Sequence, residues 1–193
     1  MTPTHNQATA TSLRSRTLVL TTIGVLVAAV LAFAAASAPA FAESYQIKNY
    51  GSGKCAGVNW WEAGNNGAGV VLQSCVSTAS PMSVYQQWTR DPVSSDGYQH
   101  FINVASGKCL DVTDGINADW TPTQQWTCTN TPGMAWKTTF PYPGVPFQVK
   151  SKIGGRCLDV RGGSLQDGAV IQIYHCTANN PAQVWTIQAP TSG

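Results

Sequence analysis

The chain carries little charge, since only 10% of its 193 residues are Asp, Glu, Lys or Arg, against about 25% in a typical soluble protein. So few charges argue against a long disordered, solvating tail. A formal net charge of +2 gives no basic surface of the kind that binds nucleic acid. The polar residues are mostly uncharged, and seven Trp and six Cys are many for this length.

Residues 1–42 have the pattern of a secretory signal peptide. Arg14 and Arg16 make the start positive, residues 18–36 are mostly apolar, and Ala-Phe-Ala at 40–42 fits an A-x-A cleavage site. An uncleaved membrane anchor is the alternative, because the apolar run is nearly long enough to cross a bilayer. Small residues at its end and the lack of a positive stop favour cleavage. We therefore expect a secreted, extracellular protein that leaves the membrane after cleavage.

The rest of the chain lacks any long apolar pattern of helical period. Short β-rich runs at 70–72 and 170–174 each precede a cysteine, and turns rich in Gly, Asn, Asp and Pro interrupt the chain throughout. This pattern predicts an all-β domain of many short strands.

Three similar segments follow one another in this part of the chain. Each contains a Gly-Lys-Cys or Gly-Arg-Cys phrase, a second cysteine and then a tryptophan. The landmarks are Cys55, Cys75 and Trp88; Cys109, Cys128 and Trp136; and Cys157, Cys176 and Trp185. Three landmarks in register indicate an internal repeat. We place the repeats at about 43–92, 93–140 and 141–189, with residues 190–193 as a tail.

Repeat symmetry favours one local disulfide in each segment among the 15 pairings that six cysteines allow. The favoured pairs are Cys55–Cys75, Cys109–Cys128 and Cys157–Cys176. Export supplies the oxidising conditions that such bonds need, and each bridge is worth about 3 kcal/mol in the loop-entropy model. Zinc binding is the weaker alternative, because there is no C-x-x-C motif and His100 and His175 occupy unrelated repeat positions. We expect no metal and no other cofactor.

The Cys-Leu-Asp-Val phrase, the second cysteine and a closing Gln-x-Trp resemble the ricin B-type lectin repeat. The third segment matches best, with Cys-Leu-Asp-Val at 157–160 and Gln-Val-Trp at 183–185. The second has Met-Ala-Trp at 134–136. The resemblance covers nearly all of 43–189 and implies a β-trefoil of three pseudo-symmetric four-stranded repeats. It also implies that the three landmark tryptophans pack in the core.

The same resemblance implies sugar-binding positions. In the family an aspartate accepts bonds from sugar hydroxyls, an aromatic ring stacks on the C–H face of a pyranose, and amides contact the remaining hydroxyls. The third repeat keeps most of this set, although Ala182 replaces an Asn. Its candidate residues are Asp159, Gln172, Tyr174 and Gln183.

The other two repeats depart further from the family. The second keeps Asp111, Gln124 and Trp126, but it has Gly133 and Met134 where an Asn-Gln pair belongs. A weakened or altered site is expected there. The first repeat has lost the acid, one amide and the aromatic, so we expect its role to be structural. The residues in those places are Gly57, Val71 and Gln73, and only Gln86 is kept.

The sequence therefore predicts a non-catalytic carbohydrate-binding protein whose best site is in the third repeat. Similar modules bind galactose, arabinose or xylose polymers. A glycoside hydrolase is one alternative, but it needs two facing carboxylates about 5–10 Å apart, and no pair of acids stands out. A protease-inhibitor-like trefoil is another, because fold does not fix function. Trp60, Trp61 and Trp120 are left without an assigned role.

Overall fold

A computed structural model of the protein describes residues 43–77, 79–139 and 142–189. The predicted signal peptide and C-terminal tail lie outside these residues. The described residues form twelve strands and five short 3-10 helices and contain no α-helix, so the all-β prediction is confirmed. Among them, no helix has the length and apolar character to span a membrane.

Each predicted repeat contains four strands. The first has β1 (Tyr45–Asn49), β2 (Cys55–Val58), β3 (Val70–Gln73) and β4 (Gln87–Arg90). The second has β5 (Phe101–Asn103), β6 (Cys109–Val112), β7 (Thr121–Trp126) and β8 (Trp136–Thr138). The third has β9 (Val149–Ser151), β10 (Cys157–Val160), β11 (Ile171–Tyr174) and β12 (Trp185–Gln188).

Short 3-10 helices lie between the strands. Three of them precede the last strand of a repeat: η1 (Pro81–Tyr85), η3 (Pro132–Met134) and η5 (Pro181–Gln183). The other two follow the second strand of a repeat: η2 (Thr113–Gly115) and η4 (Arg161–Gly163). A proline at the first turn starts each helix of the first group, where its missing N–H costs no hydrogen bond.

The first and last strands of the three repeats form a closed ring. β1 pairs with β4 and β12, β4 with β5, and β8 with β9, all antiparallel. Bridges between Gln99 and Trp136 and between Phe147 and Trp185 complete the ring. Closure leaves these strands without a free edge.

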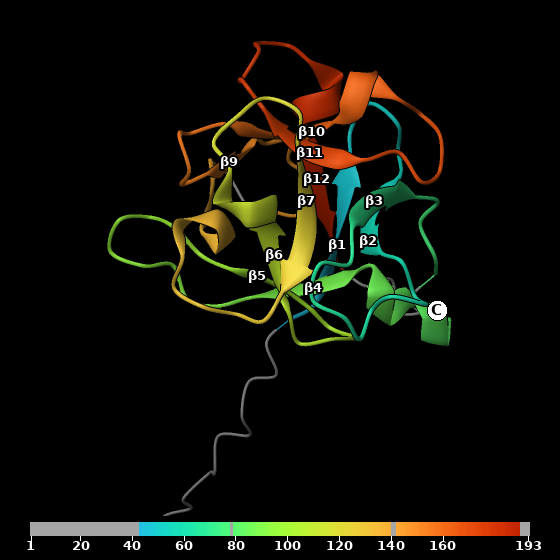
Figure 1. Ribbon diagram of the computed structural model, residues 1–193. Coiled ribbons are helices and arrows are strands. Elements are labelled where there is room, and N and C mark those ends of the chain that lie inside the picture. Colours follow the sequence, from blue (N-terminus) through green and yellow to red (C-terminus); the bar gives the residue numbers. More distant parts are fainter. Residues whose placement is uncertain (1–42, 78, 140–141, 190–193) are drawn as a thin grey trace, which may run out of the picture. The chain divides into compact units, whose positions relative to one another are not determined.

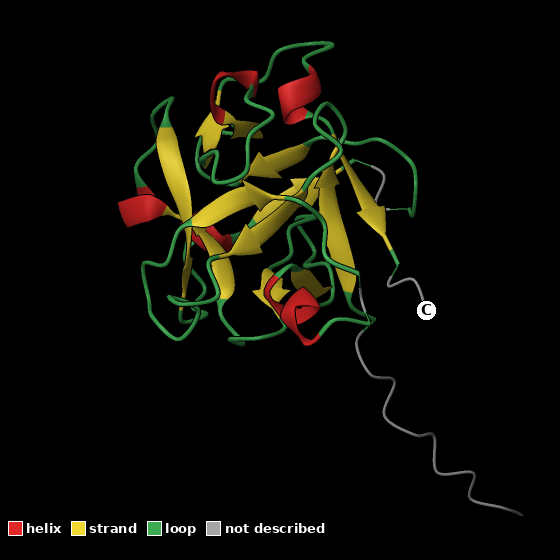
Figure 2. Ribbon diagram, turned by 90° about the vertical axis from the view of Figure 1, so that its right-hand side faces the viewer, coloured by secondary structure: helices red, strands yellow, loops and turns green. Residues whose placement is uncertain are grey.

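The middle strands form three hairpins, β2–β3, β6–β7 and β10–β11. Each hairpin touches the next one: β7 pairs with β11, and single bridges join β3 to the two others. Figure 1 and Figure 2 show this arrangement of strands. A six-stranded barrel with three hairpins is the β-trefoil that the sequence resemblance predicted.

The three landmark tryptophans, Trp88, Trp136 and Trp185, are fully buried, as predicted. Their indole Nε1 atoms donate hydrogen bonds of 3.0, 2.9 and 2.9 Å to backbone carbonyls. The acceptors are equivalent residues of the second strands, Ala56, Leu110 and Leu158. Each tryptophan thus fills the core without leaving its N–H donor unpaired, so its burial carries no penalty for a lost hydrogen bond.

Each repeat holds one disulfide, and the pairs are Cys55–Cys75, Cys109–Cys128 and Cys157–Cys176. The first cysteine of each pair opens the second strand of its repeat, and the second cysteine lies two residues beyond the third strand. The bond therefore fixes the end of the third strand, where the predicted aromatic residue lies.

Candidate functional site

The third repeat places Asp159 in β10 directly opposite Gln172 in β11. Only 4% of the aspartate is exposed. The Gln172 side chain donates a 2.9 Å hydrogen bond to Oδ1 of Asp159, and Gln183, at the end of η5, donates one of 3.1 Å to Oδ2. The carboxylate is thus held in one orientation by an amide on each oxygen.

Both amides are completely buried and bond to protein atoms. Gln183 accepts from the Thr177 backbone N–H at 2.8 Å and donates to the His175 carbonyl at 2.9 Å. Gln172 accepts a 2.6 Å bond from Arg161. In this structure the two glutamines position Asp159, and Gln172 also lines the pocket beside it. Contact of these amides with a sugar stays a prediction. Arg161 is a residue of the network that sequence reasoning missed.

Burial raises the pKa of the Asp159 carboxyl, against the lowering effect of the two amide donors. Removal from water disfavours the charged form. A carboxylate has about four acceptor positions, so the two amides leave capacity for other donors. Asp159 is therefore a fixed and poorly hydrated hydrogen-bond acceptor.

A pocket of about 250 Å³ opens at this carboxylate. Tyr174 of β11 lines it together with Asn180 and Ala182. The Asn180 side-chain oxygen caps η5 by accepting from the Ala182 N–H at 3.1 Å. Its amide group is thereby held at the pocket, close to where Ala182 replaces the family's Asn.

Trp120 also lines the pocket, although it belongs to the second repeat. Its ring centroid lies 4.8 Å from that of Tyr174, with an angle of 68° between the planes. The sequence alone assigns no role to Trp120. Aligning the repeats on their third strands would have distinguished it, because Gly67 and Gly168 occupy the equivalent positions.

The second repeat keeps the same arrangement in part. Gln124 donates a 2.9 Å bond to Asp111, and burial raises the pKa of that carboxyl. Trp126 is 41% exposed and lines a pocket of about 450 Å³ together with Asp111. Met134 stands where Gln183 stands in the third repeat; its sulfur accepts from the Thr129 N–H at 3.2 Å but has no donor for the aspartate.

The first repeat has a pocket of about 250 Å³ at the equivalent place, but the amides of Gln73 and Gln86 line it in place of the second-strand aspartate. Gln86 donates a 3.1 Å bond to Gln73 and accepts a 2.8 Å bond from the Val76 N–H. A Cβ atom on Gly57 would lie 2.6 Å from the Gln73 side-chain oxygen. The place of the carboxylate is therefore occupied by an amide.

Two histidine rings contact aspartates through Nδ1: His100 contacts Asp91 at 2.5 Å and His175 contacts Asp119 at 2.8 Å. Within residues 43–77, 79–139 and 142–189, no group of three His, Cys, Asp or Glu side chains is arranged to hold a metal ion.

A match to a family model identifies the family of this chain. A family model for ricin-type β-trefoil lectin domain-like proteins matches residues 33–126, 84–174 and 136–193. The chain belongs to this family. No curated protein matches the chain.

Solved structures of the same fold include a designed protein. ThreeFoil, a designed threefold-symmetric protein, is 25% identical, with a TM-score of 0.66 over 75% of this chain and 96% of its own. An exo-β-1,3-galactanase from Clostridium thermocellum is 29% identical, with a TM-score of 0.68 over 78% of this chain. This second match spans only 31% of the galactanase.

A natural lectin also has this fold. The ricin B-like lectin of Macrolepiota procera, solved in complex with lactose, is 20% identical, with a TM-score of 0.60 over 77% of this chain and 96% of its own. At that identity the likeness shows the fold alone.

Proposed function

We propose that the protein is a secreted, non-catalytic carbohydrate-binding protein whose principal site is the pocket of the third repeat. One observation carries this proposal: Asp159 is buried, fixed by two amides, and lies at a pocket that Tyr174 also lines. Secretion rests on the signal-peptide pattern of residues 1–42.

The two side chains suit the two faces of a sugar ring. Asp159 offers charged acceptors to neighbouring hydroxyls, and bonds to an ionised acceptor are stronger than neutral ones. The ring of Tyr174 offers an apolar surface to the C–H face of a pyranose. Asn180 supplies an amide near a third position of the ring, in place of the Asn that the family has at 182.

The second repeat provides a weaker site of the same kind around Asp111 and Trp126. A single shallow site of this type is expected to bind at about 1 mM, or roughly −4 kcal/mol. Two sites on one chain raise the apparent affinity for a polymer, because the second binding event becomes intramolecular.

We propose galactose-, arabinose- or xylose-containing glycans as the ligand class. The exo-β-1,3-galactanase that contains a similar domain, 29% identical to this chain, supports a galactose-type ligand first. The proposed site requires no cofactor, since the acceptors and the stacking surface are side chains of the protein.

The decisive experiment compares the binding of the purified protein to soluble galactan, arabinan and xylan by affinity electrophoresis and calorimetry. Asp159→Ala and Tyr174→Ala should each weaken binding at the third site about tenfold to a hundredfold, with circular dichroism unchanged. Asp167→Ala is the matched control, because Asp167 is an exposed aspartate that lies outside both proposed sites. Wild-type affinity in both site variants would refute the assignment.

The same samples test the non-catalytic part of the proposal. Each polysaccharide is incubated with the protein, and reducing ends are measured over time. We expect no increase above the rate without protein. Release of sugar that is lost in a carboxylate variant would show a hydrolase instead.

A further inference from the structure

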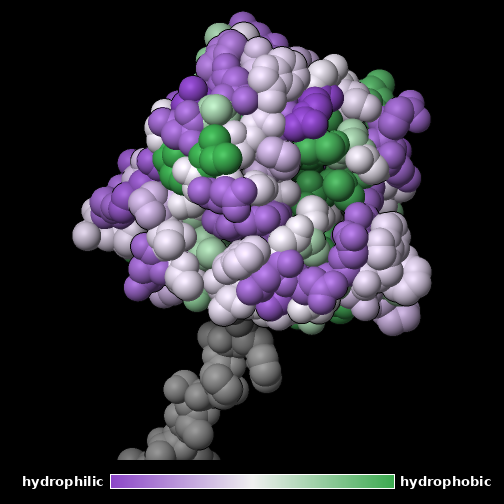
Figure 3. Space-filling model, viewed as in Figure 1, coloured by the Kyte–Doolittle hydropathy of each residue, from purple (hydrophilic) through white to green (hydrophobic). Residues whose placement is uncertain are grey.

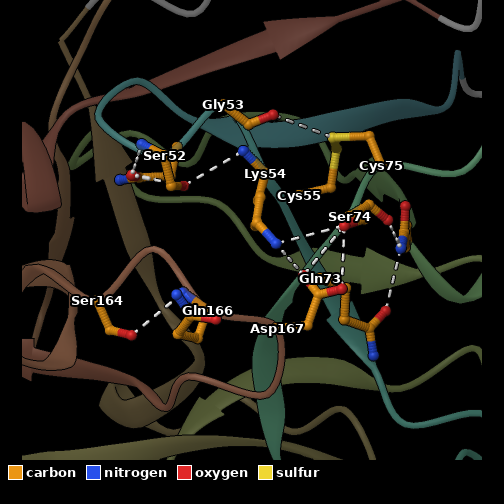
Figure 4. A network of polar contacts seen from close by, with 12 residues as sticks. Ser52, Gly53, Lys54, Cys55, Gln73, Ser74, Cys75, Ser164, Gln166 and Asp167 are labelled. Carbon is orange, nitrogen blue, oxygen red and sulfur yellow. Dashed lines mark hydrogen bonds and ion pairs between the residues drawn. A yellow bond between two sulfur atoms is a disulfide. The ribbon is translucent and has the colours of Figure 1, made fainter.

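Three turns lie between the second and third strands of their own repeat and contact the next repeat. We call them the bridging turns, and they are residues 66–67, 119–120 and 167–168. Each turn reaches the end of the third strand of the next repeat. Asn66 accepts from the Thr127 N–H at 2.9 Å, Asp119 accepts from the His175 N–H at 2.8 Å, and Asp167 binds Ser74 and Lys54. Figure 4 shows the third of these contacts.

The second residue of each bridging turn has a positive φ angle. Gly67 has a φ of 85° and Gly168 a φ of 83°, but the equivalent residue in the second turn is Trp120, with a φ of 71°. A glycine adopts this conformation without strain, whereas a bulky side chain is a genuine outlier there. Two of the three equivalent turns therefore have glycine at this position, and Trp120 is the exception.

The backbone of Trp120 is fixed on both sides by the third repeat. Its N–H donates to the Ile173 carbonyl at 3.2 Å, and its carbonyl accepts a 2.8 Å bond from Arg161. The same Arg161 bonds Gln172, which holds Asp159. Strained residues persist where surrounding contacts determine them, and they cluster at functional sites.

The indole of Trp120 is not a core residue, since 53% of Trp120 is exposed. It lies against Tyr174 at the edge of the pocket that contains Asp159. A gain in core packing therefore does not account for a tryptophan in this strained turn. An exposed aromatic ring beside a pocket is suited to stacking on an external apolar surface. The apolar residues on the face in Figure 3 form small separate patches among hydrophilic ones.

We propose that Trp120 forms a second sugar subsite, so that the third-repeat site is shared between two repeats and recognises two consecutive sugar residues. This rests on the proposed function. The two aromatic planes meet at 68°, so one flat pyranose face cannot stack on both. The residue held by Asp159 stacks on Tyr174, and the next residue of the chain stacks on Trp120. The ligand class is therefore an oligosaccharide or polysaccharide, with a free monosaccharide binding less tightly.

The test measures affinity for sugars of two lengths by calorimetry, in an Asp111→Ala background that removes the second site. The probes are galactose with β-1,3-galactotriose, xylose with xylotriose, and arabinose with arabinotriose. Trp120→Gly copies the other two turns, and Trp120→Asn keeps a residue that tolerates positive φ. Trp61→Gly removes an exposed tryptophan that lines no described pocket and is the control.

We expect both Trp120 variants to bind the trisaccharide about tenfold more weakly and the monosaccharide within about twofold of the wild type. Their thermal stability should be unchanged or higher, because the strain is relieved. Unchanged trisaccharide affinity would overturn the subsite, and so would an equal loss for both lengths. If the Asp111→Ala protein with Trp120 intact binds none of the six sugars, the proposed function fails instead, which is a different result.

Discussion

The first and third repeats have the same order of strands but differ in the residue at one position of the second strand. In the third repeat Asp159 lies there, held by two amides; in the first repeat Gly57 lies there, and Gln73 takes up the space. Both repeats keep the disulfide and the buried tryptophan. The fold and the site thus depend on different residues, so one repeat can lose its site and still support the trefoil.

The second repeat is intermediate between the other two. It has the aspartate, the supporting glutamine and the aromatic, but Met134 replaces the second amide. The position two residues before the core tryptophan is occupied by Gln86, Met134 and Gln183, and among these three residues Gln183 alone donates to an aspartate. Substitutions at this position test whether the second amide accounts for the difference between the second and third repeats.

Replacing Gln183 with methionine should have the largest effect, because it gives the third repeat the chemistry of the second. The His175 carbonyl and one oxygen of Asp159 lose a buried donor, at a cost of about 2 kcal/mol in the free energy of unfolding. Sugar affinity should fall as the carboxylate loses its fixed orientation. Urea denaturation and calorimetry measure the two effects.

The control for this variant is Gln166→Met, since Gln166 is exposed and remote from Asp159 in the hydrogen-bond network. It should match the wild type in both measurements. If Gln183→Met also kept wild-type stability and affinity, the orienting role of this amide would be disproved.

Lowering the pH should weaken sugar binding at the third site, because it protonates Asp159. Burial raises the pKa of Asp159, and the charged form is the better acceptor, so affinity should hold above the raised pKa. Below the raised pKa it should fall about tenfold, or 1.4 kcal/mol, for each pH unit. Calorimetry in the Asp111→Ala background between about pH 3 and pH 7 measures this, since the ordinary pKa is about 3.9.

Stability should respond to pH in the opposite direction. A carboxyl whose pKa is higher in the folded state favours folding below its unfolded pKa, and this contribution is lost as pH rises through the folded pKa. Asp159 therefore costs stability at neutral pH. Asp159→Asn should remove that part of the pH dependence of unfolding, and an unchanged pH profile in this variant would contradict the argument.

Repeat register and motif identity were enough to predict the trefoil, the buried tryptophans and the residues around Asp159. They were insufficient for contacts between repeats, because these depend on how the hairpins meet in space. Trp120 and Arg161 lie far from Asp159 in sequence or outside its motif, yet both belong to its network. The hydrogen bonds from Gln172 and Gln183 to Asp159 were also not predicted, since a motif does not show which partners a buried amide takes.

Replacing Met134 with glutamine should have the smallest effect. It tests whether adding the missing amide strengthens sugar binding at the second site. The new amide can donate to Asp111 and accept from the Thr129 N–H, as Gln183 does in the third repeat. In an Asp159→Ala background we expect about fivefold tighter binding at the second site, close to 1 kcal/mol, measured by calorimetry. Met134→Leu is the control, because it keeps the volume and adds no donor. Equal affinities of the glutamine and leucine variants would mean that the donor is irrelevant and that the difference between the repeats lies elsewhere in the pocket.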